Sequence, residues 1–494
     1  MTLLIVLTLT TNVKSQEYFE IDGIVYRTTS EETVEVAPYY ALSNNPYSGH
    51  ITIPQTITHN GNNYTVTALG DLAFERCIGV TSLTLPATIR HIGSYCFYNC
   101  NFPSLQLPDS LRTLGDHAFL YSRVSSLHLP AHFESYGDAT FWARNLTSIT
   151  VDEANPLYRI IDGCLYSKDS TTLRIVPDGR TQAVIIPSYV RHIDRMAFGF
   201  NTHITSVTLS EGLQSIGAFA FNICPAVNNI VIPSTVTSIG ICPFSYCPAL
   251  DNISIASGNT HYVMDGTMIY SIGYDTLVSC HKSGPTVTLN PNLRVLGGFE
   301  NNTWLQHIDI PTTVTDITDN CFNGCSITSI DLQAHLKSIG TMAFATNSNL
   351  RSVKIQQVDT IGAAAFSQTN LDYIKFTVGI PPFVTGNGPL YDIGSLDSII
   401  VPCGTLDTWL ADEYWGRKEF ASKYFEDCSS IYEPDADDIK IYSLGGHIIV
   451  EGADGEKVWI FDIEGREMRN EALPTGVYVV KVGNRPARKV VIAK

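Results

Sequence analysis

Cysteine is the residue type whose spacing in this chain most readily suggests chemistry. Cys96 and Cys100 form one Cys-x-x-x-Cys pair, and Cys321 and Cys325 form another. Paired thiols of this kind can bind a metal ion or form a disulfide. A structural metal site needs four converging ligands, however, and no second pair accompanies either of these. We therefore expect all four cysteines to be small buried core residues, and we expect no metal site.

Other motifs of catalysis are absent from the sequence. It has no H-E-x-x-H, no G-x-S-x-G, no phosphate-binding loop and no dinucleotide fingerprint. His91, His117 and His192 are scattered over variable positions, where we expect them to face solvent. The acidic run at 433–438 lacks the glycine and the closing glutamate of a calcium loop, and we interpret it as a solvated linker. These observations predict a protein that is not an enzyme and has no cofactor.

The paired cysteines belong to a unit that recurs every 22 or 23 residues. In residues 80–100 an alternating run, Leu83-Thr84-Leu85, ends at Pro86, and Ile92-Gly93 and a Cys-Phe-x-x-Cys turn follow. The phenylalanine of that turn recurs at Phe74, Phe97, Phe119, Phe141, Phe198, Phe221, Phe244, Phe322, Phe344 and Phe366. A fixed short period is typical of a solenoid, in which each unit buries its apolar face against its neighbours.

Each part of the unit has a physical interpretation. In the Leu-x-Leu run, period-two alternation sends the leucines inward and the residue between them outward, as in a strand. The proline after the run cannot donate to a ladder and ends the strand. The glycine after the second apolar pair suits either a positive φ or a close approach of two backbones.

Two stretches interrupt the array, near 152–183 and 256–286. Each has Asn-x-x-Tyr and then Asp-Gly between alternating runs, at Asp162-Gly163 and at Asp265-Gly266. Asp-Gly between alternating runs is a strong hairpin signal, so we expect a β-hairpin in each insert.

Charge and termini suggest where the protein acts. The 494-residue chain has 31 basic and 48 acidic residues, a net charge of −17, which disfavours nucleic acid as a partner. Residues 1–15 contain an apolar run too short to span a bilayer, followed by small residues before Gln16, as in a secretory signal peptide. The alternative is an apolar N-terminal strand. We expect no membrane span and a location that is extracellular or on the outer-membrane surface.

Over roughly residues 16–424 the units, of the form I-G-x-x-A-F-x-x-C-x-x-L-x-x-L-x-L-P with N-x-x-Y…D-G-x-L-Y-S inserts, resemble the BspA-like leucine-rich-repeat family. The resemblance implies a leucine-rich-repeat solenoid at 61–402. Because the chain lacks the asparagine ladder of the common leucine-rich pattern, we expect this solenoid to be mainly β, with short parallel strands and tight helical turns. We interpret residues 16–60 as the N-terminal cap that a solenoid needs. The resemblance also implies a monomeric surface protein for adhesion or protein–protein interaction, with a host-matrix or bacterial surface protein as partner. The alternatives are a glycan-binding accessory protein and, third, a secreted hydrolase.

The V-P-x-G…W segment at 403–430 resembles the closing cap of the family. Cys403 and Cys428 flank it and lie outside the repeats. Because the chain has features of an exported protein, we predict a disulfide between them.

Residues 431–494 form a linker and a tail of short alternating runs separated by glycine-rich turns, which predicts a small antiparallel β-sandwich. Val458–Arg466, Leu473–Lys481 and Lys489–Lys494 are similar to the C-terminal sorting domains of type IX secretion substrates in Bacteroidetes. The alternative is an ordinary sandwich module of an adhesin.

The candidate interaction face consists of outward positions along the predicted Leu-x-Leu strands, which extended solenoid faces use for binding. Serine and threonine are also simply good strand-surface residues, and that interpretation stays open. The face comprises Ser82, Thr84, Ser104, Gln106, Ser126, His128, Ser148, Thr150, Ser206, Thr208, Asp309, Asp331 and Lys354.

Overall fold

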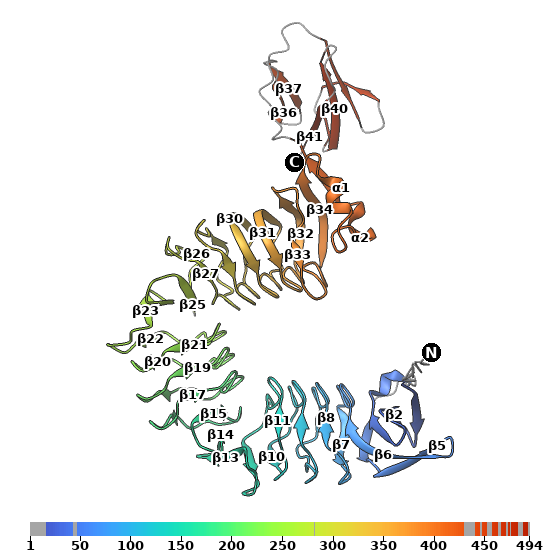
Figure 1. Cartoon of the computed structure of the whole chain (residues 1–494), viewed down its shortest axis with the longest axis vertical. Coiled ribbons are helices and arrows are strands. Elements are labelled where there is room, and N and C mark those ends of the chain that lie inside the picture. Colours follow the sequence, from blue (N-terminus) through green and yellow to red (C-terminus); the bar gives the residue numbers. More distant parts are fainter. Residues whose placement is uncertain are drawn as a thin grey trace, which may run out of the picture.

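The computed structural model describes residues 16–42, 47–280, 282–428 and, in the C-terminal segment, 440–444, 447–451, 457–462, 466–470, 473–474, 476–482 and 488–492. The predicted signal peptide at 1–15 and the acidic run at 433–438 lie outside these residues. The chain is mainly β and forms a solenoid bent into an arch, followed by a small separate β unit (Figure 1). This is the predicted fold class.

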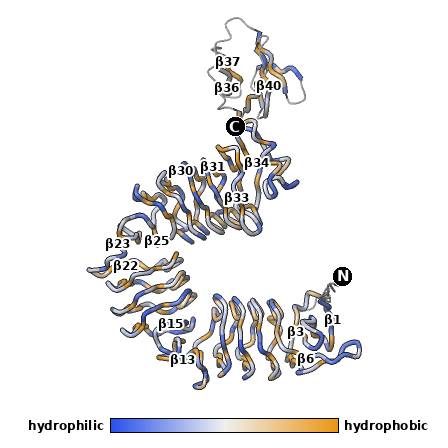
Figure 2. Tube along the Cα trace, in the orientation of Figure 1, coloured by the Kyte–Doolittle hydropathy of each residue, from blue (hydrophilic) through white to orange (hydrophobic). Residues whose placement is uncertain are grey.

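Most turns of the array contribute two short strands, one to each of two parallel ladders, and before residue 329 the first of these ladders consists of separate two-stranded pairs. The first ladder comes from the Leu-x-Leu runs and contains β4 (Ser48–Thr52), β7 (Gly79–Thr84), β10 (Ser126–Leu129), β12 (Ser148–Val151), β16 (Val184–Ile185), β18 (Val207–Thr208), β20 (Asn229–Ile232), β22 (Asn252–Ile255), β26 (Thr286–Val287) and β28 (His307–Ile308). The second ladder comes from the Ile-Gly pairs and contains β8 (His91–Ile92), β9 (Thr113–Leu114), β11 (Ser135–Tyr136), β17 (His192–Ile193), β19 (Ser215–Ile216), β21 (Ser238–Ile239), β27 (Val295–Leu296) and β29 (Asp316–Ile317). Long strands β30 (Ser329–Ile339) and β31 (Ser352–Ile361) serve both ladders. Figure 2 shows polar and apolar segments alternating along the turns.

The first ladder is less continuous than the sequence predicts. Residues 104–107 form no strand between β7 and β10, although Leu105 and Leu107 are buried as expected. Prolines 103 and 108 flank this segment, and proline cannot donate a ladder hydrogen bond.

The third side of each turn is the Ala-Phe-x-x-Cys segment, whose backbone amides alternate between two kinds of partner. The Phe74 amide donates to the Cys96 carbonyl of the next turn, whereas the Cys77 amide donates to the Phe74 carbonyl in its own turn. The second kind of bond is the tight 3₁₀ type, and it closes single turns rather than a continuous helix. Leu72 and Arg76 have φ of 61° and 55°, a conformation that costs energy and that the hydrogen bonds between turns sustain.

Phenylalanine rings stack along the core. The ring centroids of Phe198 and Phe221 are 4.5 Å apart, and those of Phe322 and Phe344 are 5.1 Å apart. Phe299, which the spacing analysis did not include, stacks on Phe322 at 5.3 Å. Offset stacking of buried rings stabilises beyond the burial of their area.

The repeat cysteines are buried free thiols, as predicted. They also act as hydrogen-bond donors: Cys100 Sγ lies 3.0 Å from the Phe74 carbonyl oxygen, and Cys224 Sγ lies 3.1 Å from that of Phe198. Asn347 takes the same place in another turn, with Nδ2 2.7 Å from the Phe322 oxygen. In these turns the side chain therefore binds the carbonyl of the preceding turn, which a small apolar residue could not do.

The repeat glycines serve close approach rather than positive φ. A Cβ on Gly93 would lie 2.5 Å from the Asp71 nitrogen, and one on Gly115 would lie 2.4 Å from the Ser94 nitrogen. Neither glycine has a positive φ. Any side chain here would push two turns apart.

Each insert is a three-stranded antiparallel unit whose last strand enters the second ladder. The strands are β13 (Tyr158–Ile161), β14 (Cys164–Ser167) and β15 (Thr172–Ile175), and then β23 (Tyr262–Asp265), β24 (Met268–Ser271) and β25 (Thr276–Cys280). β15 pairs in parallel with β17, and β25 with β27, but neither pairs with the preceding strand of the ladder. Within residues 47–428 the inserts therefore divide the second ladder into three sections.

Both ends of the core are covered. The N-terminal side has β1 (Tyr18–Ile21), β2 (Ile24–Thr28), β3 (Thr33–Val36), a 3₁₀ turn η1 (Tyr39–Ala41), β5 (Thr56–His59) and β6 (Asn62–Leu69). The C-terminal side has β32 (Asn370–Phe376), β33 (Phe383–Val384), β34 (Ser395–Pro402), β35 (Tyr424–Asp427) and the short helices α1 (Leu406–Leu410) and α2 (Lys418–Ala421). Trp409 and Trp415 are fully buried against Phe376. No helix among the described residues is long and apolar enough to cross a membrane.

The C-terminal unit has a two-stranded sheet of β36 (Lys440–Leu444) and β37 (His447–Glu451), and a sheet of β38 (Val458–Phe461), β39 (Glu467–Met468), β40 (Gly476–Val482) and β41 (Arg488–Ile492). All of its strand pairs are antiparallel. Ile448 of the first sheet shares one apolar cluster with Ile460 and Val480 of the second, as in a small sandwich.

Cys403 and Cys428 form a disulfide that joins the end of β34 to the end of β35, with their Cα atoms 4.6 Å apart. The bond closes a 25-residue separation. We predict that Cys403→Ser combined with Cys428→Ser lowers the free energy of unfolding of this cap by about 3 kcal/mol, because the unfolded segment gains loop entropy. Hydrogen exchange of residues 395–428 measures the loss, and reductant should then have no further effect on the variant. Two free thiols in non-reducing peptide mapping of the native chain would contradict the prediction.

Candidate interaction surface

The residues predicted to form the interaction face, hereafter the polar row, all reach the surface. Ser82, Ser148 and Lys354 are half-exposed, and the other members are exposed. The inward neighbours Leu127 and Ile149 are buried on either side of His128 and Thr150, as alternation requires. Strand register aligns Ser126 with Ser148 and His128 with Thr150, so these positions stack from turn to turn.

Members of the polar row also interact with one another. His128 Nδ1 lies 2.9 Å from Thr150 Oγ1, and Lys354 Nζ lies 3.1 Å from Asp331 Oδ2. Exposed pairs of this kind contribute little to stability. They align the side chains along the strand ladder.

The arch gives the two ladders different surroundings. In Figure 1 the first-ladder strands β20 and β22 lie on the outer side of the arch, and the second-ladder strands β19 and β21 lie on the inner side. The insert strands β13 and β23 lie on the outer side of the arch at the places where it bends (Figure 1). The polar row therefore follows the outer side, in segments that change direction at the inserts.

The histidines differ in their surroundings. His91 and His192 are exposed, as predicted, and bond to Thr113 and Ser215 of the next turn. The expectation for His117 is wrong. Its ring is half-buried and stacks on Tyr95 with centroids 4.6 Å apart, and burial lowers its pKa. The cause is its position directly before Ala118 and Phe119, on the third side of the turn. There its ring meets the aromatic side chain of Tyr95 from the adjacent turn.

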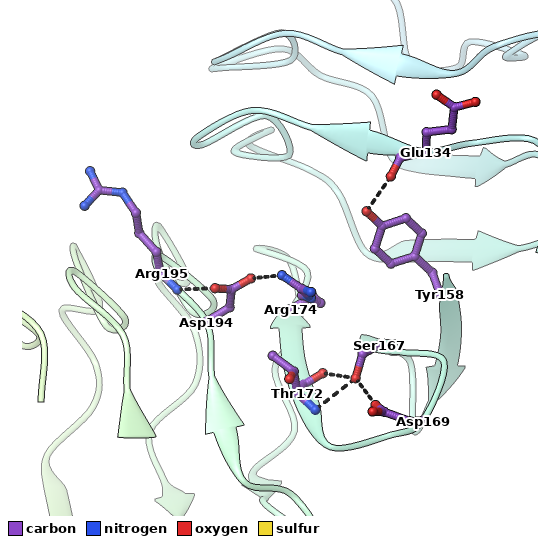
Figure 3. Close-up of polar contacts among 8 residues, drawn as sticks. All are labelled: Glu134, Tyr158, Ser167, Asp169, Thr172, Arg174, Asp194 and Arg195. Atoms are coloured by element: carbon purple, nitrogen blue, oxygen red, sulfur yellow. Dashed lines mark hydrogen bonds and ion pairs between the residues drawn. The ribbon is translucent and has the colours of Figure 1, made fainter. Parts of the chain in front are cut away.

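Figure 3 shows the polar contacts at the first bend. The Tyr158 hydroxyl donates to the Glu134 carbonyl oxygen at 3.0 Å and so satisfies a backbone group at the edge of the preceding section. Arg174 Nη1 lies 2.6 Å from Asp194 Oδ2. Arg195 Nε lies 2.9 Å from Asp138 Oδ2, an ion pair that crosses the bend.

The Asn-x-x-Tyr motif ties both inserts to the array in the same way. Asn155 Nδ2 donates to the carbonyls of Pro130 and Phe133, and Asn259 Nδ2 donates to those of Pro233 and Val236. At the second bend the Tyr262 hydroxyl accepts a hydrogen bond from the Ile239 amide at 2.8 Å. The Tyr158 hydroxyl at the first bend likewise binds the backbone, but as a donor to the Glu134 carbonyl. The motif is thus a structural connector rather than a binding signature.

Among the described residues, Cys403, Glu426 and Cys428 are the only potential metal ligands that converge. Both sulfurs are bonded to each other, and Glu426 Oε1 accepts the Gly404 amide at 2.8 Å. These three residues therefore stabilise the cap, and their sulfurs are not available as metal ligands. The buried thiols of the repeats are poor nucleophiles, since burial raises the pKa of Cys77 to about 11 and that of Cys242 to about 12.

The second bend contains a buried carboxyl that the sequence analysis did not single out. Glu300 Oε2 is buried and has no hydrogen-bond partner. Burial raises the pKa of the Glu300 carboxyl to about 7 from an ordinary 4.5, although the charge of Arg195 and the Ser245 hydroxyl oppose the shift. Below about pH 7 the neutral acid is therefore the favoured form in the folded chain.

This shift predicts a pH-dependent stability. Because the pKa is raised in the folded state, the contribution of Glu300 to the free energy of unfolding is fully present below about pH 4.5 and is lost as the pH rises through 7. The free energy of unfolding should fall by about 3 kcal/mol over this range. We expect Glu300→Gln to remove this part of the pH dependence, measured as denaturant midpoints between pH 4.5 and 8. The exposed Glu153→Gln serves as a control and should follow the native chain. An unchanged pH profile in Glu300→Gln would contradict the assignment.

Comparison with known proteins places the array in a family. The family model described as the BspA type leucine rich repeat region matches in six copies, over residues 67–182, 178–280 and 271–383. No curated protein matches the chain.

Several solved structures are similar. A leucine-rich repeat protein from Eubacterium ventriosum is 22% identical, with 66% of this chain and 92% of that chain covered and a TM-score of 0.40. A leucine rich cell surface protein from Faecalibacterium prausnitzii is 19% identical, with 79% and 97% covered and a TM-score of 0.40. A leucine-rich repeat protein from Bacteroides ovatus is 20% identical, with 83% and 99% covered and a TM-score of 0.33. Since the family model matches well over half of its length, the chain belongs to the BspA-type leucine-rich-repeat family.

Proposed function

We propose that this protein is exported to the cell surface and mediates adhesion by binding other proteins along the outer side of its solenoid. The observation that carries the proposal is the polar row, in which exposed or half-exposed hydroxyl, imidazole, amide and charged side chains recur on many turns and stack directly where the turns adjoin, as at Ser126–Ser148 and His128–Thr150. Extended, repeated surfaces of this kind suit the multivalent contacts of protein recognition. The partner proposed is a host-matrix protein or a surface protein of another bacterium.

The proposal assigns binding rather than catalysis because the exposed polar groups are spread along the ladder. A catalytic site needs a nucleophile, an acid and a base that converge on one point. In the polar row, neighbouring members such as His128 and Thr150 bond to each other across strands instead.

Export is proposed to use both ends of the chain. The signal peptide at 1–15 would direct the first step, and the C-terminal sandwich would act as a type IX sorting domain. The described strands of that sandwich support the second role, because the similar stretches at 458–466 and 473–481 include β38 and most of β40, which pair with each other. An ordinary sandwich module of an adhesin remains the alternative.

The polar row is tested by adding bulk and charge to it. We expect the triple variant Thr84→Arg, His128→Arg and Thr150→Arg to bind immobilised extracellular-matrix proteins and bacterial surface extracts at least tenfold more weakly, since large side chains block contact with the strands. Ser135→Arg, His192→Arg and Ser238→Arg, at exposed positions of the second ladder, serve together as the matched control. Equal loss in both variants, or no loss in the first, would overturn the assignment of the face.

The sorting role is tested by truncation after Cys428, assayed by surface labelling of the producing bacterium. The truncated protein should fold, because the disulfide and the cap are intact, but should not reach the surface. A full-length Val480→Asp chain, with a charge in the fully buried centre of the sandwich, should fail in the same way. Normal surface delivery of the truncated chain would show that the tail is not a sorting signal.

A further inference from the structure

A small cleft lies at the second bend, where the second and third sections of the array meet. It has a volume of about 90 Å³ and is lined by residues 244–248, by Ser279, Cys280 and Lys282 at the end of the insert, and by Gly298 and residues 300–304. These segments come from three separate parts of the chain. At this place the insert interrupts the ladder, because β21 ends one sheet and β25 belongs to the next.

Two exposed aromatic side chains line this cleft from opposite sides of the bend. Tyr246 is 51% exposed and Trp304 is 69% exposed. A large exposed tryptophan is unusual on a soluble surface, and aromatic faces of this kind are preferred contact surfaces for ligands. Tyr246 has a φ of 56°, so its backbone is held in a conformation that few tyrosines adopt.

Polar groups of the cleft are fixed in place before any ligand binds. Asn301 Nδ2 lies 3.3 Å from Ser245 Oγ, and that hydroxyl donates to the Glu300 carbonyl oxygen at 3.2 Å. The Asn301 side chain lies against Gly324, where a Cβ would approach its Oδ1 to 2.5 Å. Lys282 Nζ lies 2.6 Å from Asp251 Oδ1 at the rim. Groups held in this way cost little entropy to engage.

The combination selects a class of ligand. The one cation among the described residues of the lining, Lys282, is already paired with Asp251. Apart from Glu300, the other polar side chains of the lining are hydroxyls and amides, which favour a neutral polar ligand, and the net charge of −17 disfavours an anion. A pyranose ring has an apolar C–H face that can lie on an aromatic ring, and hydroxyls on its edge that amide and hydroxyl groups can bind. A cleft of 90 Å³ is far smaller than the roughly 300–1,000 Å³ of drug-sized sites, so it has room for part of one ring only.

We propose that this cleft binds the terminal unit of a neutral saccharide, with Tyr246 and Trp304 contacting the ring faces and Asn301 bonding its hydroxyls. The site is separate from the polar row and goes beyond the proposed protein-binding function.

The experiment uses the full chain and a panel of glucose, galactose, mannose, fucose and N-acetylglucosamine. Each sugar is supplied free for titration by tryptophan fluorescence and on albumin for a multivalent binding assay. We expect at least one sugar to bind, and Trp304→Ala and Tyr246→Ala each to weaken its binding at least tenfold. Trp304→Phe should recover part of the affinity because a flat aromatic face remains. Tyr189→Ala, at an exposed tyrosine outside the cleft, is the matched control and should bind like the native chain.

Two results would overturn the proposal: no sugar of the panel binds in the multivalent assay, or binding persists unchanged in Trp304→Ala. Tetramethylammonium is included as a cationic probe, and saturation by it with no response to any sugar would also overturn the saccharide assignment. Melting curves of the variants should match that of the native chain, since both aromatic side chains are exposed.

Discussion

The structure depends on the spacing between consecutive turns. Strands that share a ladder lie about 4.8 Å apart, so every side of the turn must keep the same spacing. Stacked phenylalanines such as Phe198 and Phe221 set it in the core, and glycines such as Gly93 permit it at the corner. Amide bonds between successive Ala-Phe turns set it on the third side. One bulky residue at the corner would disrupt all three sides at once.

The same constraint explains the inserts. Where a three-stranded insert replaces a plain turn, the second ladder is interrupted, and the backbone groups at the open edge need other partners. Tyr158 and Tyr262 supply them, one as a donor and one as an acceptor. The arch bends at these places in Figure 1. Surface features that no single repeat contains, such as the cleft beside Trp304, arise where the regular stacking stops.

Much of the candidate surface could be predicted from the sequence, because alternation along a strand fixes which side chains point outward. Thr84, His128 and Thr150 are exposed for that reason. His117 and Trp304 lie outside the strands, so alternation does not predict whether their side chains are exposed. The signal for the cleft was present in the sequence as a tryptophan at a position where the repeat needs no apolar residue. Its partner Tyr246 is 58 residues away and could not be connected with it from the repeat pattern alone.

The sequence by itself determined the period, most strand positions, most residues of the core and the places of the inserts, because each depends on a pattern within one or two turns. It left two functions open for the repeat glycines, and the structure shows that Gly93 and Gly115 permit close contact, while Leu72 and Arg76 carry the positive φ. It identified the buried cysteines but not their thiol bonds to the preceding turn. Only the tertiary structure decided these matters, because each depends on how far one turn lies from the next.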